Sequence, residues 1–246
     1  MRNIKLTLQY DGTDYFGWQR QKNTHRTLAE IIEGILKKIL RDQVKLIAAG
    51  RTDAGVHAQA QVANFTTVSA MDNSRLSHSL NALLPEDIRV ITAKDVPLDF
   101  NSRYSAKAKT YRYTILNRHT CDVFLRRYVY HFPQSDLDVS AMRKASAILV
   151  GSHDFASFKR ADKKKRTTIR DLKDIKVMRR GELIYIDVTA NSFLYHMVRN
   201  IAGTLIEIGK GKLLPESLKK ILQSKDRKTA GPTAPARGLC LMKVEY

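Results

Sequence analysis

The chain has 246 residues, enough for one large domain or two smaller ones, and its apolar fraction of 43% is ordinary for a globular protein. Its 43 lysines and arginines against 24 acidic residues give a formal net charge of +19, which favours a polyanionic partner such as nucleic acid. No apolar run suits a membrane span, no secretory segment precedes the first strand-like pattern, and Cys121 and Cys240 indicate neither a disulfide framework nor a zinc site, so we expect a cytoplasmic protein.

The first half of the sequence predicts the order strand, helix, strand, strand, helix, strand. Apolar residues alternate at the start, and an amphipathic stretch follows in which Thr27 and Glu30 offer a capping box. Pro85 ends the second helix. This order is that of a ferredoxin-like unit. The predicted elements cover residues 3–10, 28–40, 44–49, 59–66, 73–84 and 88–96.

The second half predicts a similar alternation of strands and helices. A strand, a shorter strand and a helix precede a hairpin, two further helices and a last strand. The fold class is therefore α+β, with two ferredoxin-like or RRM-like halves that carry mixed antiparallel sheets. We expect domains over 1–105 and 106–246, with a basic cleft between them as the natural binding site. The predicted elements cover residues 109–116, 129–132, 139–150, 169–178, 183–189, 193–209, 215–222 and 239–244.

The segment GRTDAGVHA, residues 50–58, places a carboxylate where a buried strand ends. Asp53 lies among glycines that let the backbone approach a ligand closely, and Arg51 is near enough in sequence to keep the carboxylate ionised. A carboxylate in this position can act as a nucleophile or a base. The alternative is a surface turn, where Asp and Gly occur for local reasons.

Four further segments carry a resemblance when they are set beside this loop. They are YDGTDYFGWQRQ (10–21), KTYRYTI (109–115), SFLYHMVRNIAG (192–203) and PTAPARGLCL (232–241). In this order the five segments resemble the TruA family of tRNA pseudouridine synthases over the whole chain. One departure is Asn101-Ser102, between Phe100 and Arg103, where the family often has His-Ala.

The resemblance implies the pseudouridine synthase fold and a cofactor-free isomerase. Such an enzyme detaches uracil from ribose, rotates it and rejoins it through carbon 5. Its substrate would be uridines of the tRNA anticodon stem-loop, and the enzyme would be a homodimer. Because these uridines are paired in a stem, the base must first be flipped out.

The resemblance also implies roles for individual residues. Asp53 matches the nucleophile, which attacks either uracil carbon 6 or the anomeric carbon of ribose. Tyr111 matches a tyrosine that stacks on the target base and is a candidate for removing the carbon 5 proton, although strand tyrosines are often only packing. Arg199 matches a basic residue expected to pair with Asp53, the alternative being a solvated arginine. Arg51 would orient Asp53 or contact a phosphate, and Leu239 would line the uracil pocket, which is compatible with a plain core position.

Basic residues in two loops are candidates for contacts with the RNA backbone. A run of this kind is also typical of a solvated loop or a nuclear-localisation signal. The seven histidines form no i,i+4 pair with a carboxylate ligand, so we expect no metal. The candidates are Arg20, Lys22, Arg26, Lys163, Lys164, Lys165 and Arg166.

Two other function classes fit parts of the sequence. A non-catalytic RNA-binding module would explain the charge and the ferredoxin-like order, but it has no use for a carboxylate aimed at an anionic ligand. A metal-dependent nuclease would use Asp53 as a ligand, and its activity would be lost in a chelator.

Overall fold

The computed structural model describes residues 1–134, 136–160 and 167–246. The chain forms two compact units: the first contains Met1–Lys107 and Cys240–Tyr246, and the second contains Ala108–Leu239. The sequence placed all of 106–246 in the second domain. The structure differs because the last seven residues belong to the first unit.

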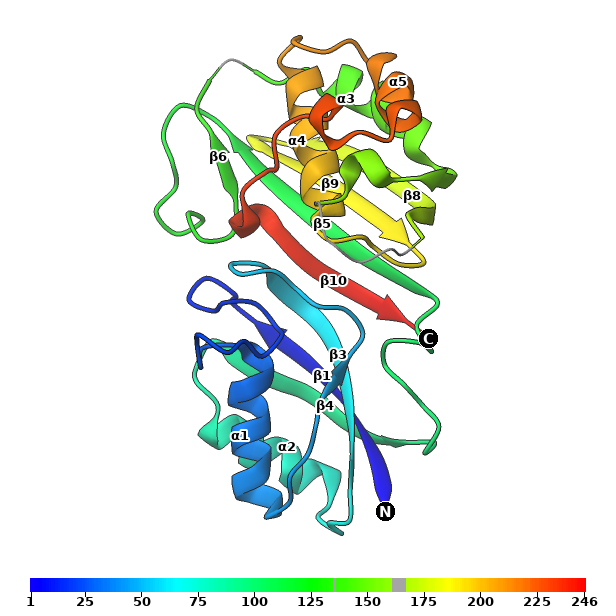
Figure 1. Cartoon of the computed structure of the whole chain (residues 1–246). Coiled ribbons are helices and arrows are strands. Elements are labelled where there is room, and N and C mark those ends of the chain that lie inside the picture. The colour runs from blue at the N-terminus through cyan, green and yellow to red at the C-terminus, as the bar shows by residue number, and fades with distance from the viewer. Residues whose placement is uncertain (135, 161–166) are drawn as a thin grey trace. The chain divides into compact units, whose positions relative to one another are not determined.

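The first unit has the strand order of a ferredoxin-like sheet. β1 pairs antiparallel with both β3 and β4, and β2 pairs antiparallel with β3. Helices α1 and α2 pack together on one face of this sheet (Figure 1). The elements are β1 (Arg2–Tyr10), α1 (Leu28–Leu40), β2 (Ile47–Ala48), β3 (His57–Thr67), α2 (Asn73–Leu83), β4 (Ile88–Val96) and β10 (Leu239–Glu245), which joins the unit from Cys240 onward.

Strand β3 has one edge that is shared between two partners. β1 runs along its other edge. On the shared edge, β2 pairs with Ala63 and Asn64, whereas Cys240 and Leu241 of β10 pair in parallel with the first two residues of β3. The expected strand over 44–49 is therefore wrong in length, since only two of its residues pair with β3.

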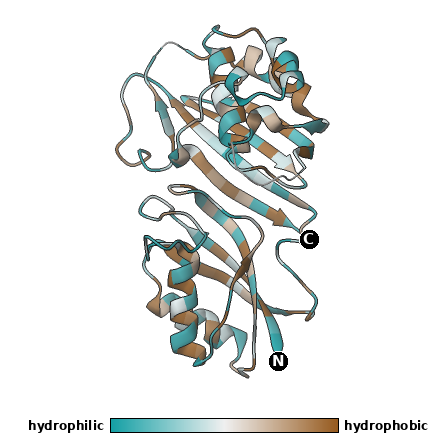
Figure 2. Ribbon diagram, in the orientation of Figure 1, coloured by the Kyte–Doolittle hydropathy of each residue, from teal (hydrophilic) through white to brown (hydrophobic). Residues whose placement is uncertain are grey.

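Burial of one face explains why the first strand and helix form. Along β1 the apolar side chains alternate with more exposed ones, and Leu6 and Leu8 are fully buried. Along α1 the buried positions Leu28, Ile32 and Leu36 recur at helical spacing, and the helix alternates between hydrophobic and hydrophilic patches in Figure 2.

The capping box predicted for α1 does not form. Thr27 is the N-cap residue with an extended backbone, but its buried hydroxyl has no hydrogen-bond partner among the described residues. Glu30 instead pairs with His25, whose Nδ1 lies 2.9 Å from its Oε1. The start of α1 is thus held by the burial of its apolar face rather than by a side-chain cap.

The second unit is also an α+β layer structure. β5 pairs antiparallel with β9, β9 with β8 and β8 with β7, while β6 pairs in parallel with β5. The three α-helices lie together on one side of this sheet (Figure 1). The elements are β5 (Ala108–Asn117), β6 (Tyr130–Phe132), α3 (Val139–Ser146), β7 (Gly151–Asp154), β8 (Ile169–Arg180), β9 (Leu183–Ala190), α4 (Met197–Gly209) and α5 (Ser217–Ser224).

Two helices of this unit are shorter than the sequence predicts. α3 ends at Ser146 and continues as a 3-10 turn over Ala147–Leu149. α4 begins at Met197 rather than at Phe193, because His196 adopts a left-handed conformation with φ of 64° that the helix cannot include. Strand β7 was not predicted, since its four residues carry no alternating apolar pattern.

Candidate active site

The Asp53 loop lies between β2 and β3 and is supported by the loop that follows β1. Trp18 donates its backbone N–H to the carbonyl of Thr52 at 3.0 Å, and Gly55 donates to the carbonyl of Tyr15 at 3.3 Å. Within the loop, Val56 donates to the carbonyl of Asp53 at 3.2 Å. Two of the five motif segments are thus brought together, and the 10–21 segment forms the support for the Asp53 turn.

Glycines make this close approach possible. Gly17 has φ of 84°, and a Cβ there would lie 2.7 Å from the carbonyl oxygen of Thr52. A Cβ on Gly12 would lie 2.0 Å from the carbonyl oxygen of Val56. A side chain at either position would push the support away from the Asp53 loop.

Side chains alternate in direction along this loop. Thr52 is buried, whereas Arg51 before it is exposed and Asp53 after it is partly exposed. The sequence predicted that Arg51 holds this carboxylate ionised. That role of Arg51 stays a prediction.

In the second unit, Tyr111 lies on β5 opposite Val188 of β9. The residue is 7% exposed, and its ring is in T-shaped contact with the ring of Phe193, with centroids 5.0 Å apart and planes at 84°. Phe193 belongs to the segment that leads into α4. The tyrosine is therefore packed from the side by a second motif segment.

Tyr113, two residues along the same strand, has a structural contact of its own. Its hydroxyl donates to the carbonyl of Pro235 at 2.9 Å. Burial raises the pKa of Tyr113 well above its usual value, with a further contribution from Tyr130. Tyr113 therefore stays protonated and joins β5 to the 232–241 segment.

Arg199 is anchored on the first turn of α4. Its Nε donates to the carbonyl of Ala234 at 2.8 Å, and the N–H of Ala234 donates to the carbonyl of Arg199 at 3.1 Å. Its Nη1 lies 3.4 Å from Nε2 of His196. This reciprocal pair anchors Arg199 to the main chain, and its role at the site stays a prediction.

A polar network that the sequence analysis missed holds the same segment. Asn200 accepts from the Thr233 hydroxyl at 2.6 Å and from Nη2 of Arg227 at 3.1 Å, and its Nδ2 donates to the carbonyl of Phe158 at 2.6 Å. Burial lowers the pKa of Arg227. The only signal in the sequence is an asparagine within the apolar run of α4.

Leu239 is buried and begins β10. The next residue, Cys240, pairs with His57, which is the first residue of β3 and lies four positions after Asp53. The position is compatible with both interpretations of Leu239, a core residue and a wall of a uracil pocket.

Asn101 and Ser102, where the sequence departs from the family pattern, have structural roles. The side-chain oxygen of Asn101 accepts from the N–H groups of Arg103 and Tyr104 at 3.0 and 3.2 Å. Ser102 is fully buried, and its carbonyl accepts from the Tyr246 hydroxyl at 2.9 Å. The pair builds a turn and attaches the end of the chain to it.

Three of the predicted RNA-binding residues lie on the exposed loop before α1. Arg20, Lys22 and Arg26 are all exposed. The guanidinium of Arg20 forms ion pairs with two acidic side chains. Its Nη2 lies 3.7 Å from Oε1 of Glu30, and its Nε lies 3.5 Å from Oε2 of Glu33. The other four candidates, Lys163, Lys164, Lys165 and Arg166, lie outside the described residues.

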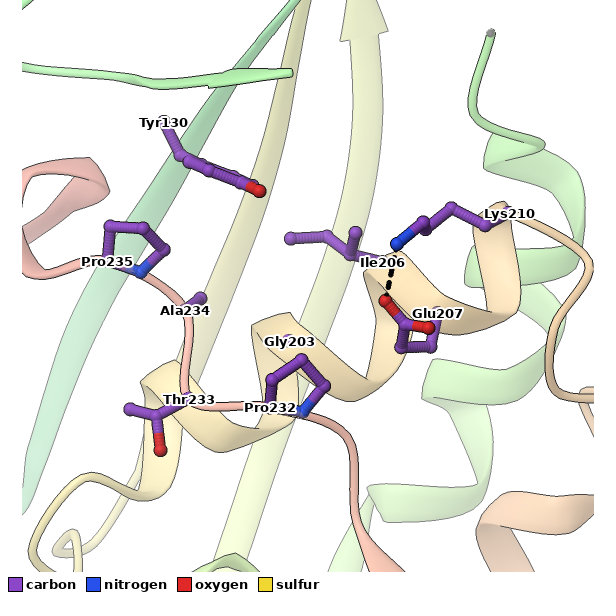
Figure 3. A pocket seen from close by; sticks show the side chains of 9 residues that line it. All are labelled: Tyr130, Gly203, Ile206, Glu207, Lys210, Pro232, Thr233, Ala234 and Pro235. Carbon is purple, nitrogen blue, oxygen red and sulfur yellow. Dashed lines mark hydrogen bonds and ion pairs between the residues drawn. The ribbon is translucent and has the colours of Figure 1, made fainter. Parts of the chain in front are cut away.

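A cavity of about 280 Å³ opens beside α4 in the second unit (Figure 3). Its charged groups already pair, because Nζ of Lys210 lies 2.7 Å from Oε1 of Glu207. Tyr130 and Pro235 close one side of it. The cavity borders the Pro232–Pro235 segment that carries the Ala234 contact of Arg199.

Residues 1–134, 136–160 and 167–246 contain neither a candidate membrane span nor a candidate metal cluster. No helix there is both long and apolar enough to span a membrane. Within the same ranges, no cluster of three or more His, Cys, Asp or Glu side chains is arranged to hold a metal ion.

Comparisons with known proteins agree with the motif segments. The sequence model of the family described as tRNA pseudouridine synthase matches residues 7–105 and 145–246. The chain is 48% identical over 244 residues to tRNA pseudouridine synthase A of Moorella thermoacetica, covering 99% of both chains, and 47% identical to that of Caldicellulosiruptor bescii over the full length of both. A chain in "Crystal Structure of a Cbf5-Nop10-Gar1 Complex" is 13% identical, with 97% of this chain and 48% of that chain covered and a TM-score of 0.36, too distant to support an argument.

The family match and the identity over the full length lead to one conclusion: the chain belongs to the TruA family of tRNA pseudouridine synthases, isomerases that act on uridine in tRNA.

Proposed function

We propose that this isomerase uses Asp53 as its nucleophile on uridines of the anticodon stem-loop of tRNA. The observation that supports the proposal is the arrangement of the loop. Asp53 lies partly exposed on a turn whose neighbours Thr52 and Val56 are buried and whose backbone is bonded to the 10–21 segment. A carboxylate fixed in this way is available to a substrate without further ordering of the loop.

The reaction conserves the atoms of the nucleotide. The bond between ribose carbon 1′ and uracil N1 breaks, uracil rotates while it is held by the enzyme, and a bond forms between carbon 1′ and carbon 5. Carbon 5 loses its proton and N1 gains one. Asp53 forms a covalent bond during this exchange and is released at the end, so no external reagent is consumed.

Tyr111 is proposed to stack on the flipped uracil. Its ring is in T-shaped contact with Phe193, so the orientation of the ring is supported before a base stacks on it. Stacking of a base on an aromatic side chain is worth about 1–3 kcal/mol, which offsets part of the cost of extruding a paired uridine. We assign Arg51, Arg199 and Leu239 as further substrate-binding residues.

The rest of the proposal concerns the partner. The positive charge of the chain suits the phosphates of folded tRNA, and Arg20, Lys22 and Arg26 are exposed for such contacts. Lys163, Lys164, Lys165 and Arg166 are assigned the same role. We further propose that the enzyme is a cytoplasmic homodimer that requires no cofactor.

The central test is the Asp53→Ala variant with unmodified tRNA. We expect pseudouridine formation to be abolished while the affinity for tRNA stays within about tenfold, because the substitution removes a reacting group and not a phosphate contact. Pseudouridines are mapped at single-nucleotide resolution after incubation with the purified protein. The mapping also shows whether the anticodon stem-loop is modified.

Asp72→Asn is the matched control. Asp72 caps α2 by accepting from the N–H groups of Ser74 and Arg75, and asparagine caps a helix equally well. This variant should keep full activity. Wild-type activity in Asp53→Ala would remove Asp53 from the mechanism, and loss of activity in a chelator would favour a metal-dependent enzyme.

A further inference from the structure

We infer that Tyr10 and Gln61 are positioning residues for Asp53. They hold Gly50 and Thr52, two residues of the loop that lead up to the carboxylate, and so set the direction in which it points. The inference rests on the proposed role of Asp53 as the nucleophile.

Three hydrogen bonds form the connection. The hydroxyl oxygens of Tyr10 and Thr52 lie 2.8 Å apart. Nε2 of Gln61 donates to the hydroxyl oxygen of Tyr10 at 3.3 Å and to the carbonyl of Gly50 at 2.8 Å. Tyr10 is the last residue of β1 and Gln61 lies on β3, so two adjacent strands of the sheet are hydrogen-bonded to the loop.

The three side chains of this hydrogen-bond network are buried. Tyr10, Thr52 and Gln61 are 3%, 6% and 0% exposed. Burying a hydroxyl or an amide is costly unless its hydrogen bonds are made, and apolar side chains could fill the same space without that cost. Polar groups at these positions therefore favour a requirement for directed contacts over simple packing.

The consequence for Asp53 follows from the alternation of side chains along the chain. Thr52 points inward to Tyr10, so Arg51 and Asp53 are turned away from the core. Burial raises the pKa of Tyr10 well above its usual value, so its hydroxyl keeps its proton and the contact persists through the neutral range. A reacting group displaced by 1 Å loses on the order of a hundredfold in rate.

Removing single hydroxyls tests this inference. Tyr10→Phe keeps the aromatic ring, and Thr52→Val keeps the shape of the side chain, yet each loses the contact with its partner. We expect the single-turnover rate of pseudouridine formation, with enzyme in excess, to fall about 10- to 100-fold, because the carboxylate is no longer held in line with the substrate. The Kd for tRNA should change by less than about threefold, and Thr52→Ser, which retains the hydroxyl, should restore most of the rate.

The control makes the same threonine-to-valine change at Thr67, the last residue of β3. Thr67 is also buried, and its hydroxyl donates to Asp42 at 3.1 Å. Thr67→Val should therefore lower the urea midpoint as Thr52→Val does, but it should leave the single-turnover rate unchanged. This comparison separates lost stability from lost positioning.

Two outcomes would overturn the inference: wild-type rates in both Tyr10→Phe and Thr52→Val, or an equal loss of rate in Thr67→Val. Its failure is distinct from that of the proposed function. If Asp53→Ala were inactive while the hydroxyl variants kept their rates, Asp53 would remain the nucleophile without this support. If Asp53→Ala were active, the role of Asp53 itself would be withdrawn.

Discussion

At the scale of single residues, Tyr111 and Arg199, both proposed to bind substrate, are held in place by neighbouring residues of the second unit. The rings of Tyr111 and Phe193 form a T-shaped contact, which helps to set the orientation of the tyrosine ring. Arg199 uses Nε for the carbonyl of Ala234, so its guanidinium is held by the main chain at its inner end. If both side chains bind substrate as proposed, this order would lower the entropy cost of binding.

Tyr111→Phe distinguishes stacking from proton transfer. Phenylalanine keeps the aromatic face and the contact with Phe193, so we expect the Kd for tRNA to stay within about threefold. If the hydroxyl takes part in removing the carbon 5 proton, the single-turnover rate should fall at least about tenfold. A primary isotope effect with uridine deuterated at carbon 5 should increase in the variant. A wild-type rate would limit Tyr111 to stacking.

At the scale of elements, α4 and the Pro232–Pro235 segment depend on one close approach. A Cβ on Gly203 would lie 1.7 Å from the carbonyl oxygen of Pro232, so the helix and the segment touch through the backbone. The same segment accepts Nε of Arg199 and is tied to Asn200 through Thr233. A glycine in mid-helix is normally unfavourable, and here its small size permits the approach.

Two glycine substitutions in helices should therefore have opposite effects. Gly203→Ala should lower the free energy of unfolding by about 1–3 kcal/mol, because the added methyl overlaps with backbone atoms. Gly34→Ala, in α1, should raise it by about 0.5–1 kcal/mol, since nothing lies within 4 Å of the added carbon. Urea denaturation of both variants measures the difference. Gly203→Ala should also lose activity, because it displaces Ala234 from Arg199, and equal stability of the two variants would contradict this account.

The sequence predicted elements better than contacts. The alternation in β1 and the amphipathic pattern of α1 correctly indicated a strand and a helix, because burial of one face determines both. The capping box at Thr27 failed, because a local pattern cannot tell whether Glu30 has a closer partner, here His25. The contact of Arg199 with Ala234 joins residues 35 positions apart, and only the folded chain reveals it.

At the scale of the whole molecule, several tyrosines share an electrostatic property. Burial raises the pKa of Tyr246 to about 12 and raises those of Tyr10, Tyr15 and Tyr113 further. In Tyr15, the neighbouring Asp87 adds to the effect of burial. Tyr10, Tyr15 and Tyr246 belong to the first unit and Tyr113 to the second, so the stability of each unit depends on the same range of pH.

We expect alkaline pH to destabilise the protein steeply. In the unfolded chain these tyrosines ionise near pH 10, whereas the folded protein keeps their protons, so stability is full below about pH 10 and falls as the pH rises beyond it. Each tyrosine contributes a slope of about 1.4 kcal/mol per pH unit until its folded pKa is reached. Urea denaturation between about pH 9 and about pH 11 measures the slope, which should become shallower in Tyr246→Phe. A flat profile would contradict the raised pKa values.

The pairing of β10 with β3 has a consequence for how the protein is made. The first unit is synthesised first, yet its sheet lacks Cys240–Tyr246 until all of Ala108–Leu239 has left the ribosome. Until then, the edge of β3 beside the Asp53 loop presents unpaired backbone groups, which other chains could bind. The nascent chain is therefore exposed to aggregation at the strand that leads out of the Asp53 loop until Cys240–Tyr246 has been synthesised and pairs with it.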